Sequence, residues 1–282
     1  MTDTKPPTAP AFTFAGVPLD RPRIMGILNV TPDSFSDGGD LPTARAAVDR
    51  GLAMVEDGAD FLDVGGESTR PGSQPVAVDE ELRRVVPVVE GLAAAGAVVS
   101  VDTRNAPVMR AAVAAGARIV NDVSALTHDP AALEAMAALD AHLVLMHMKG
   151  DPRTMQQAPV YADVVADVKA YLAGRVAACV GAGIPRDRVA VDPGIGFGKT
   201  VDHNLTLLRH LDALGGLGCP VLLGVSRKSF IARVDRDGPA KGRLAGSLVA
   251  ALAGVRRGAL ILRVHDVAET RQALSIHAAI EG

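Results

Sequence analysis

The feature that most constrains the fold is a pattern that recurs eight times after residue 23: a short apolar run, a polar or glycine-rich break, and an alanine-rich amphipathic segment. Short apolar runs bounded by turn residues are typical of buried parallel strands, and the longer segments between them have the periodicity of helices. Eight such units exceed what an ordinary doubly wound sheet uses and match the count of a closed barrel. The pattern therefore predicts an α/β fold, a single (β/α)8 TIM barrel.

The expected elements alternate along the chain. The predicted strands are Ile24–Leu28, Phe61–Val64, Val98–Val101, Ile119–Asn121, Leu143–Met146, Val189–Val191, Val221–Leu223 and Leu260–Leu262. The predicted helices are Thr43–Asp57, Asp79–Ala95, Ala106–Ala115, Pro130–Leu139, Tyr161–Gly181, His203–Leu214, Arg243–Arg257 and Val267–Ile280. Helix signals support these limits, such as Gly58 after the first helix and Pro107 in the first turn of the third.

No break in composition marks a boundary inside the barrel region, so residues 21–282 are predicted to form one domain. Residues 1–20 are expected to contribute a disordered arm and a short hairpin over Phe12–Leu19, outside the main sheet. The first twelve residues lack the charged and apolar regions of a secretory signal. No apolar run approaches the ~18 residues that a membrane span needs.

Charge and cysteine content narrow the partners. The net charge is −3 with scattered Lys and Arg, which argues against nucleic acid or an anionic membrane as the main partner. Cys179 and Cys219 have no metal-ligand spacing, so free thiols in a reducing, cytoplasmic compartment are expected. Small anionic ligands remain compatible with this composition.

Polar residues follow every predicted strand. In chain order these are Asn29; Asp63 and the loop GGESTRPGS; Asp102-Thr103-Arg104; Asn121-Asp122; His147-Met148-Lys149-Gly150; Asp192 and PGIGFGKT; Gly224-Val225-Ser226-Arg227-Lys228-Ser229; and Arg263-Val264-His265-Asp266. The carboxyl ends of barrel strands meet in one mouth, which is where barrel enzymes place their active sites. The set predicts a binding or catalytic site.

Each of these residues also has a structural interpretation. Asp102 or Asp122 could cap a helix, Asn29 or Asn121 could bond its own loop, Asp192 could form a turn before Pro193, Arg263 could pair with Asp266 on the surface, His265 could be structural, and Lys228 could be solvated. Eight independent structural explanations at one rim are less economical than one shared site.

Two loops contain partial motifs. Gly194–Thr200 is similar to a phosphate-binding loop, but Pro193 replaces its first glycine, and the spacing GxGxG differs from the dinucleotide fingerprint. We interpret it as a strand-to-helix loop whose backbone can approach a ligand, with Phe197 as an aromatic wall. The loop over residues 67–73 is rich in donors and glycine, as in a mobile lid or an anion clamp.

These residue types favour binding and electrostatic stabilisation over covalent catalysis. Asp102, Asn121 and Asp192 could accept hydrogen bonds from a flat heterocycle, and Lys228 could reach a ring acceptor from the opposite edge. Arg263 and His265 suit a phosphate or diphosphate. Asn29 offers the hard oxygen that Mg²⁺ accepts alongside phosphate and water. The sequence presents no nucleophile with an adjacent base and no cluster spaced for zinc.

Eight segments of the chain carry a resemblance to a known family: MGILNVTPDSFSDGG, DVGGESTRPGS, SVDT, NDV, LMHMKGDPRTMQ, DPGIGFGKT, GVSRKSF and RVHDV. In this order they resemble the bacterial dihydropteroate synthase family, and the resemblance extends over Arg23–Ala273. The resemblance implies joining 6-hydroxymethyl-7,8-dihydropterin diphosphate to para-aminobenzoate, with release of diphosphate. The product would be 7,8-dihydropteroate, in folate synthesis. It also implies Mg²⁺, sulfonamide binding and a homodimer.

The resemblance assigns roles to individual positions. The pterin would be bound by four residues that also act in catalysis: Asp102, Asn121, Asp192 and Lys228. The diphosphate end would be bound by Asn29, Thr69, Arg263, Val264 and His265, with Mg²⁺ on Asn29. The para-aminobenzoate pocket would be formed by Phe35, Arg70, Pro71, Phe197 and Ser229. Family chemistry implies that the C–O bond ionises first and that Asp102 then stabilises the pterin cation. The loops after the first two strands would close over the second substrate.

Three other functions are compatible with parts of the pattern. A methyltetrahydrofolate-dependent corrinoid methyltransferase would share the barrel and the pterin contacts, but has no need of the diphosphate site. A catalytically silent pterin-binding homologue should lose rim residues, which this chain retains. A Schiff-base aldolase using Lys228 predicts trapping of a carbonyl substrate by borohydride.

Overall fold

The structure is a computed structural model that describes residues 12–30, 44–67, 76–150 and 159–281. Its centre is a closed barrel of eight parallel strands in the order β10-β3-β4-β5-β6-β7-β8-β9. These are β3 (Arg23–Asn29), β4 (Phe61–Gly65), β5 (Val99–Asp102), β6 (Ile119–Asp122), β7 (His142–Met146), β8 (Val189–Asp192), β9 (Val221–Leu223) and β10 (Ala259–Val264). The predicted TIM barrel is confirmed, with strand limits shifted by at most two residues.

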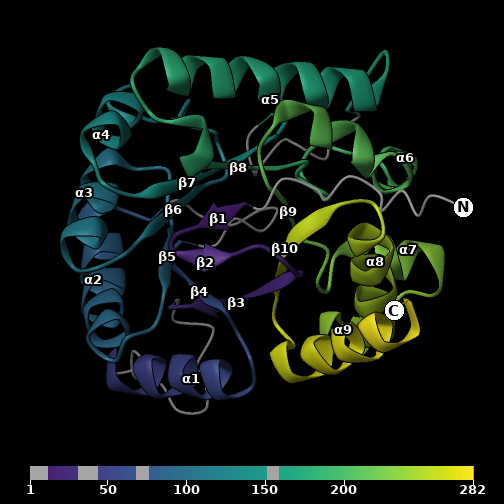
Figure 1. The fold of residues 1–282 in the computed structure, drawn as a ribbon, viewed down its shortest axis with the longest axis horizontal. Helices are drawn as coiled ribbons and strands as arrows, with labels where there is room; N and C mark the ends of the chain where they lie inside the picture. Colours follow the sequence, from purple (N-terminus) through teal and green to yellow (C-terminus); the bar gives the residue numbers. More distant parts are fainter. Residues whose placement is uncertain (1–11, 31–43, 68–75, 151–158, 282) are drawn as a thin grey trace, which may run out of the picture.

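Helices surround the barrel in chain order, from α1 at the bottom of Figure 1, through α5 at the top, to α9. They are α1 (Ala44–Glu56), α2 (Val78–Ala94), α3 (Ala106–Ala114), α4 (Ala132–Ala138), α5 (Val164–Gly181), α6 (Val201–Arg209), α7 (Ser229–Val234), α8 (Leu244–Val255) and α9 (Val267–Glu281), with 3-10 helices η2 (Arg186–Arg188), η3 (Leu211–Leu217) and η4 (Ala240–Arg243). This ring gives the parallel sheet its outer apolar cover.

Three helix predictions are wrong in detail. The helix predicted over His203–Leu214 is two elements, because α6 ends at Arg209 and η3 follows. The fifth helix starts three residues later than predicted, because the Asp163 side chain caps it by accepting from the backbone of Val165 and Ala166. The prediction misses α7, since six residues are too few to display helical periodicity.

The inward-facing side chains of the barrel change from apolar to polar over one step along the strands. The lowest layer is buried and apolar; its members are Met25, Phe61, Ile119, Val144, Ala190, Leu222 and Ile261. Residues two positions apart share a face of a strand. The next inward positions therefore include Asp63, Asn121, Asp192 and Arg263. The upper half of the barrel interior is thus built for polar contacts.

A two-stranded hairpin outside the main sheet is confirmed, and it covers the amino-terminal end of the barrel. Its strands are β1 (Thr13–Phe14) and β2 (Val17–Pro18), which lie across the middle of the ring in Figure 1. Ala15 and Gly16 between them have φ of 49° and 82°, as a type I′ turn requires. Phe14 is fully buried, with its ring edge-on to His142 at 4.9 Å and to Phe61 at 6.3 Å.

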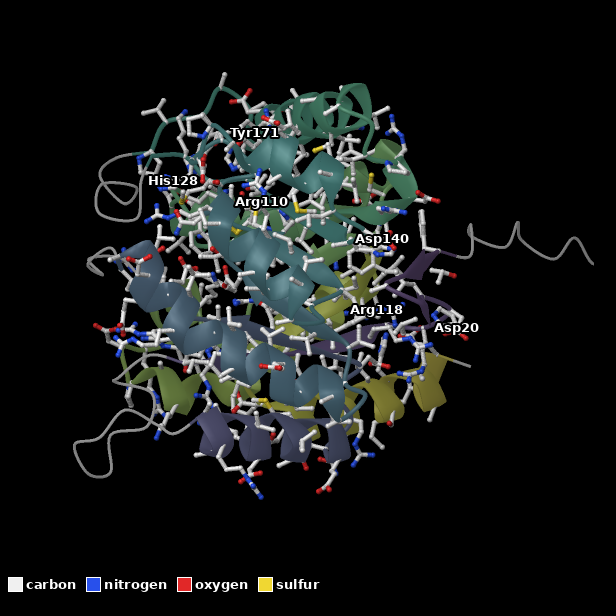
Figure 2. The ribbon with its side chains drawn as sticks, turned by 90° about the vertical axis from the view of Figure 1, so that its left-hand side faces the viewer. Asp20, Arg110, Arg118, His128, Asp140 and Tyr171 are labelled. Atoms are coloured by element: carbon white, nitrogen blue, oxygen red, sulfur yellow. The ribbon has the colours of Figure 1, made fainter. Side chains whose placement is uncertain are left out.

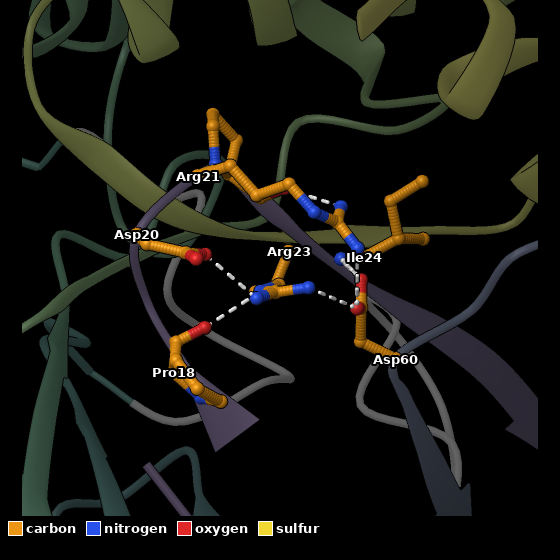
Figure 3. A network of polar contacts seen from close by, with 7 residues as sticks. Pro18, Asp20, Arg21, Arg23, Ile24 and Asp60 are labelled. Atoms are coloured by element: carbon orange, nitrogen blue, oxygen red, sulfur yellow. Dashed lines mark hydrogen bonds and ion pairs between the residues drawn. The ribbon is translucent and has the colours of Figure 1, made fainter. Parts of the chain in front are cut away.

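Arg23 ties the hairpin to the barrel (Figure 3). Its guanidinium donates to the carbonyl of Pro18 at 2.7 Å, to Asp20 at 2.7 Å and to Asp60 at 3.0 Å. Asp60 also accepts from the backbone of Ile24 at 2.8 Å. The hairpin therefore closes this end of the barrel with both apolar and polar contacts.

Replacing Phe14 with leucine is expected to lower the free energy of unfolding by about 1 to 2 kcal/mol, through lost burial and an incompletely filled cavity. Urea unfolding followed by far-ultraviolet circular dichroism measures this. Val180→Ala is the control, because Val180 is exposed and its loss should change stability by less than about 0.5 kcal/mol. An equal effect of the two changes would contradict the packing role of the hairpin.

The two ends of the barrel differ in character. In Figure 2 the labelled Asp20, Arg118 and Asp140 lie toward the hairpin end, and His128 lies toward the opposite end, where the strands terminate.

The arm over residues 1–11 lies outside the described residues, and the division into residues 1–20 and 21–282 stays a prediction. None of the helices in the described ranges combines the length and hydropathy that a membrane-crossing segment requires.

Candidate active site

The rim, meaning the carboxyl ends of the barrel strands, places four residues side by side on neighbouring strands. Asn29 of β3 is in register with Gly65 of β4, Gly65 with Asp102 of β5, and Asp102 with Asn121 of β6. A side chain at Gly65 would lie 3.5 Å from the Asp102 side chain and 3.6 Å from Asn29 Oδ1. Glycine at this position leaves open the space between the two polar side chains. Such a space is needed if Asn29 and Asp102 contact the same ligand.

Asp63 and Ser100 lie one step below the rim, in register with each other on β4 and β5. Both are fully buried. The Asp63 carboxylate accepts three hydrogen bonds: from Ser100 Oγ at 2.6 Å, from Asn121 Nδ2 at 3.0 Å and from Arg263 Nε at 2.6 Å. These two residues form the floor of the site, and Asp63 connects three strands through it.

Arg263 links the floor to the rim. Its NH2 group donates to Asp102 at 2.6 Å while its Nε donates to Asp63. The alternative that Arg263 pairs with Asp266 on the surface is wrong: Arg227 makes the ion pair with Asp266. The inward direction of Arg263 follows from its parity with buried Ile261 on β10.

Burial raises the pKa of Asp102 to about 7, even though the adjacent Arg263 guanidinium lowers it. The nearby carboxylate of Asp63 raises it further by repulsion. Titration of Asp102 therefore falls near neutral pH, which is typical of groups in active sites.

Asp192 and Lys228 form the opposite wall. Asp192 accepts from the backbone of Gly194 at 2.7 Å, and burial raises its pKa. Lys228 Nζ lies 4.0 Å from the centre of the Phe197 ring, a cation–π contact. Burial lowers the pKa of Lys228 to about 8, opposed by the charge of Asp192. Lys228 is half-buried and its ammonium contacts the Phe197 ring, so the alternative of a fully solvated Lys228 is wrong.

The turn that carries Lys228 is held in a strained conformation. Arg227 has φ of 59°, outside the region that residues with a side chain favour. Its backbone N–H donates to Ser247 Oγ at 2.9 Å, and its carbonyl accepts from Arg243 at 3.0 Å. Strain of this kind persists where surrounding contacts hold it, often at functional sites. Ser226 Oγ accepts from the backbone of His265 at 3.2 Å and lies 3.0 Å from its Nδ1, so the β9 and β10 loops are joined as well.

Sequence reasoning missed Lys199, which points into the protein rather than toward a phosphate. Its Nζ lies within hydrogen-bond distance of four acceptors: the carbonyls of His147, Gly194 and Phe197, and His147 Nδ1 at 2.9 Å. Burial lowers the pKa of His147 to about 3, so its ring is neutral with Nδ1 as acceptor. Burial lowers the pKa of Lys199 to about 7, opposed by the charge of Asp192. The four acceptors stabilise the ammonium form, because a neutral amine would direct its lone pair at one of them.

The glycines of this loop allow it to lie against the β7 loop. A Cβ on Gly194 would lie 1.9 Å from the carbonyl oxygen of His147, and one on Gly198 would lie 2.2 Å from that of Lys149. Both have positive φ. The close backbone approach predicted for a ligand is thus made, in the described residues, to the neighbouring loop.

Other predicted residues have different placements. Asp122 forms a turn by accepting from the backbone of Ser124 and Leu126, Val264 is buried in the core, and Ser229 is exposed at the start of α7. The remaining predicted positions Phe35, Thr69, Arg70 and Pro71, with the lid loops that carry them, lie outside the described residues.

The donor set at Asn29 fits Mg²⁺ better than a transition metal. Asn29 Oδ1 is a hard oxygen at the end of β3, close to Asp102 across Gly65. The described residues contain no group of three or more His, Cys, Asp or Glu side chains arranged to hold an ion. Mg²⁺ commonly takes most of its shell from phosphate oxygens and water, so one or two protein oxygens suffice.

The fold and rim define a barrel enzyme that binds a flat, nitrogen-rich heterocycle, and residues 25–265 match the family described as pterin-binding enzymes. The Escherichia coli (strain K12) dihydropteroate synthase is 48% identical over 259 residues, which cover 92% of this chain and 91% of that protein.

Two solved structures are similar over nearly the whole chain. The Xanthomonas albilineans dihydropteroate synthase with 4-aminobenzoic acid has a TM-score of 0.91 and 52% identity, covering 98% of this chain and 99% of the other. The Yersinia pestis dihydropteroate synthase in a sulfonamide drug complex has a TM-score of 0.90 and 43% identity, covering 96% and 99%. The chain therefore belongs to the dihydropteroate synthases, transferases within the pterin-binding enzyme family.

Proposed function

We propose that the rim site joins (7,8-dihydropterin-6-yl)methyl diphosphate to para-aminobenzoate, giving 7,8-dihydropteroate and diphosphate for folate biosynthesis. The observation that carries this proposal is the convergence of three acceptors, Asp102, Asn121 and Asp192, around the cations of Arg263 and Lys228. A pterin presents several N–H donors on one edge and ring acceptors on another, which this arrangement complements. The names of the relatives support the synthase rather than the methyltransferase or a silent homologue.

The reaction requires charge stabilisation more than proton transfer. The C–O bond breaks and its electron pair leaves with the diphosphate, so positive charge develops on the methylene carbon and the attached ring. The Asp102 carboxylate stabilises that charge in a site of low dielectric. The aniline nitrogen of para-aminobenzoate then forms the C–N bond and loses one proton to water or to the departing diphosphate.

The diphosphate end is proposed to be held by Asn29, Arg263, the backbone at Val264, and His265, together with Thr69 from the loop after β4. Asn29 would hold Mg²⁺, which supplies charge neutralisation to the leaving diphosphate when it is bound. Ser226 Oγ lies 3.0 Å from His265 Nδ1, and this contact orients the His265 ring at the end of β10.

The second substrate is proposed to lie against Phe197, with Ser229 and the loop residues Phe35, Arg70 and Pro71 completing the pocket. A sulfonamide would compete at the same place. Binding of the diphosphate substrate first, followed by closure of the loops after β3 and β4, would create this pocket.

The direct test supplies the pterin diphosphate, Mg²⁺ and para-aminobenzoate, and measures 7,8-dihydropteroate and its inhibition by a sulfonamide. Product formation that competes with the sulfonamide is the expected result, and absence of product would contradict the proposal. Borohydride trapping of a carbonyl substrate on Lys228 would instead indicate the aldolase alternative.

Lys199→Met is expected to raise the KM for para-aminobenzoate about three- to tenfold, because the carbonyls that fix the Phe197 loop lose their shared donor. Initial rates with each substrate varied in turn measure this effect. The matched control is Thr200→Ala in the same loop, which removes the cap of α6 and should lower stability by about 1 kcal/mol without changing this KM. An unchanged KM in Lys199→Met would rule out the positioning role.

The chain is further proposed to act as a homodimer in the cytoplasm. Exposed apolar side chains on α8 and α9, including Val249 and Ile276, support a self-association surface on these helices. The two cysteines are free and buried, as suits a reducing compartment. Sedimentation equilibrium tests the oligomeric state.

A further inference from the structure

Asp63 lies in the barrel interior at a depth where a carboxylate needs strong compensation. It is fully buried on the floor of the site. Within the described ranges, Asp63 contacts two side chains that are proposed to bind the substrate, Asn121 and Arg263. Burying a charge without partners is costly, so this carboxylate depends on its three donors. The same dependence makes it a strong constraint on the side chains that donate to it.

The contact with Asp63 determines which way the Asn121 amide faces. An ionised carboxylate can only accept hydrogen bonds, so the Asn121 atom 3.0 Å from Asp63 must be the NH2 group. The carbonyl oxygen Oδ1 is then the atom directed away from the floor. Asn121 is in register with Asp102 at the rim, so two acceptors stand side by side. A reversed amide would place a donor there and oppose the N–H groups of a pterin.

Asp63 constrains Arg263 by the same carboxylate oxygen. Oδ2 accepts from both Asn121 and Arg263 Nε, and Arg263 NH2 reaches Asp102 at 2.6 Å. A guanidinium held at two of its nitrogens has a fixed plane, so its third nitrogen has a defined direction. One buried oxygen thus orients a group from the pterin side and a group from the diphosphate side.

We infer that Asp63 is a positioning residue that sets substrate specificity: it orients Asn121 as a hydrogen-bond acceptor for the pterin ring and fixes Arg263 for the diphosphate. This inference rests on the proposed function, because it assigns those two groups to the two ends of one substrate. Asp63 itself does not touch the substrate, and its effect passes through the two side chains above it.

Two probes separate the two routes, 6-hydroxymethylpterin for Asn121 and inorganic diphosphate for Arg263, each measured by calorimetry with Mg²⁺ present. Asp63→Ala is expected to weaken binding of the pterin about 10- to 100-fold, because Asn121 loses the partner that orients it. Asp63→Asn should stay within about threefold, since its amide can turn its oxygen toward Asn121 and its NH2 toward the Ser100 hydroxyl, which can accept. Asp122→Asn on β6 is the matched control, because this buried carboxylate accepts from its own turn rather than from the floor, and it should also stay within about threefold.

A double-mutant cycle tests the route. In an Asn121→Ala background, Asp63→Ala should have no further effect on pterin affinity, because the side chain through which it acts is gone. A full additional loss in that background would overturn the inference. Equal affinity of wild type and Asp63→Ala would overturn it as well while leaving the proposed function intact, whereas failure of the wild type to bind pterin would overturn both.

A charge exchange provides the test if Asp63→Ala does not fold. Asn121→Asp alone places two carboxylates 3.0 Å apart and should abolish pterin binding. Asp63→Asn combined with Asn121→Asp restores one amide and one carboxylate at the same two positions. We expect the exchange to recover pterin affinity to within about tenfold of wild type. Diphosphate affinity should stay low, because the NH2 group that then faces position 121 also opposes the Nε–H of Arg263. No recovery of pterin affinity would overturn the positioning role.

Discussion

Replacing Arg263 with alanine is expected to lower the free energy of unfolding by about 3 to 5 kcal/mol, because two buried carboxylates lose their cation. Asp63 is fully buried and Asp102 is 6% exposed, so water replaces little of the lost interaction. Urea unfolding at several pH values measures the deficit. The same variant should weaken the diphosphate substrate more than para-aminobenzoate, and equal losses for both would contradict the proposed role of Arg263.

The deficit caused by Arg263→Ala is expected to be larger at pH 8 than at pH 6. Arg263 lowers the pKa of Asp102, which burial has already raised to about 7, so this pKa rises further when Arg263 is absent. Below about pH 6 the carboxyl is mostly protonated in both proteins and no longer needs a cation. A deficit independent of pH would contradict this coupling. Arg188→Ala, which breaks an exposed ion pair with Asp140, should cost less than about 1 kcal/mol at either pH.

The barrel itself was predictable because its strands are short, apolar and separated by amphipathic segments. Burial forces each strand to be apolar on both faces, which leaves a local signal at every repeat. The elements that the sequence did not reveal, among them η2, α7 and η4, are short and lack that periodicity. Their contacts matter all the same, since Arg243 at the end of η4 donates to the turn that carries Lys228.

The identity of the rim residues was predictable, but their partners were not. The structural interpretation of the sequence pairs Arg263 with Asp266, three positions along the chain. Barrel closure instead brings Asp63, 200 positions away, to 2.6 Å from Arg263 Nε. Asp63 belongs to the set of polar residues that predicted the site, but the sequence assigned it no role of its own, because its function depends on donors from three other strands.

Asp102→Asn is expected to reduce kcat about 100- to 1,000-fold, because the amide cannot supply the negative charge that stabilises the pterin cation. In wild type, the pKa of Asp102 near 7 predicts that kcat/KM for the pterin diphosphate falls about tenfold per unit below pH 7. The Asn variant has no ionisable group at this position, so its residual activity should lack this acid limb. Retention of more than a third of the activity, or an unchanged acid limb, would contradict the assignment.

The stability of Asp102→Asn is expected to differ in direction from its activity. The folded-state pKa of Asp102 is raised above its unfolded value of about 4, so the folded protein binds this proton more tightly and stability falls as pH rises from about 4 to 7. Asparagine removes that cost, and the variant at pH 8 should unfold at no lower urea concentration than wild type.

Asp122→Asn on the neighbouring strand is the matched control. Its carboxylate accepts from Ser124 and Leu126, so the amide should cost about 1 to 3 kcal/mol of stability while activity is largely kept. Opposite outcomes for two buried aspartates would separate a charge that acts on the substrate from one that holds a turn.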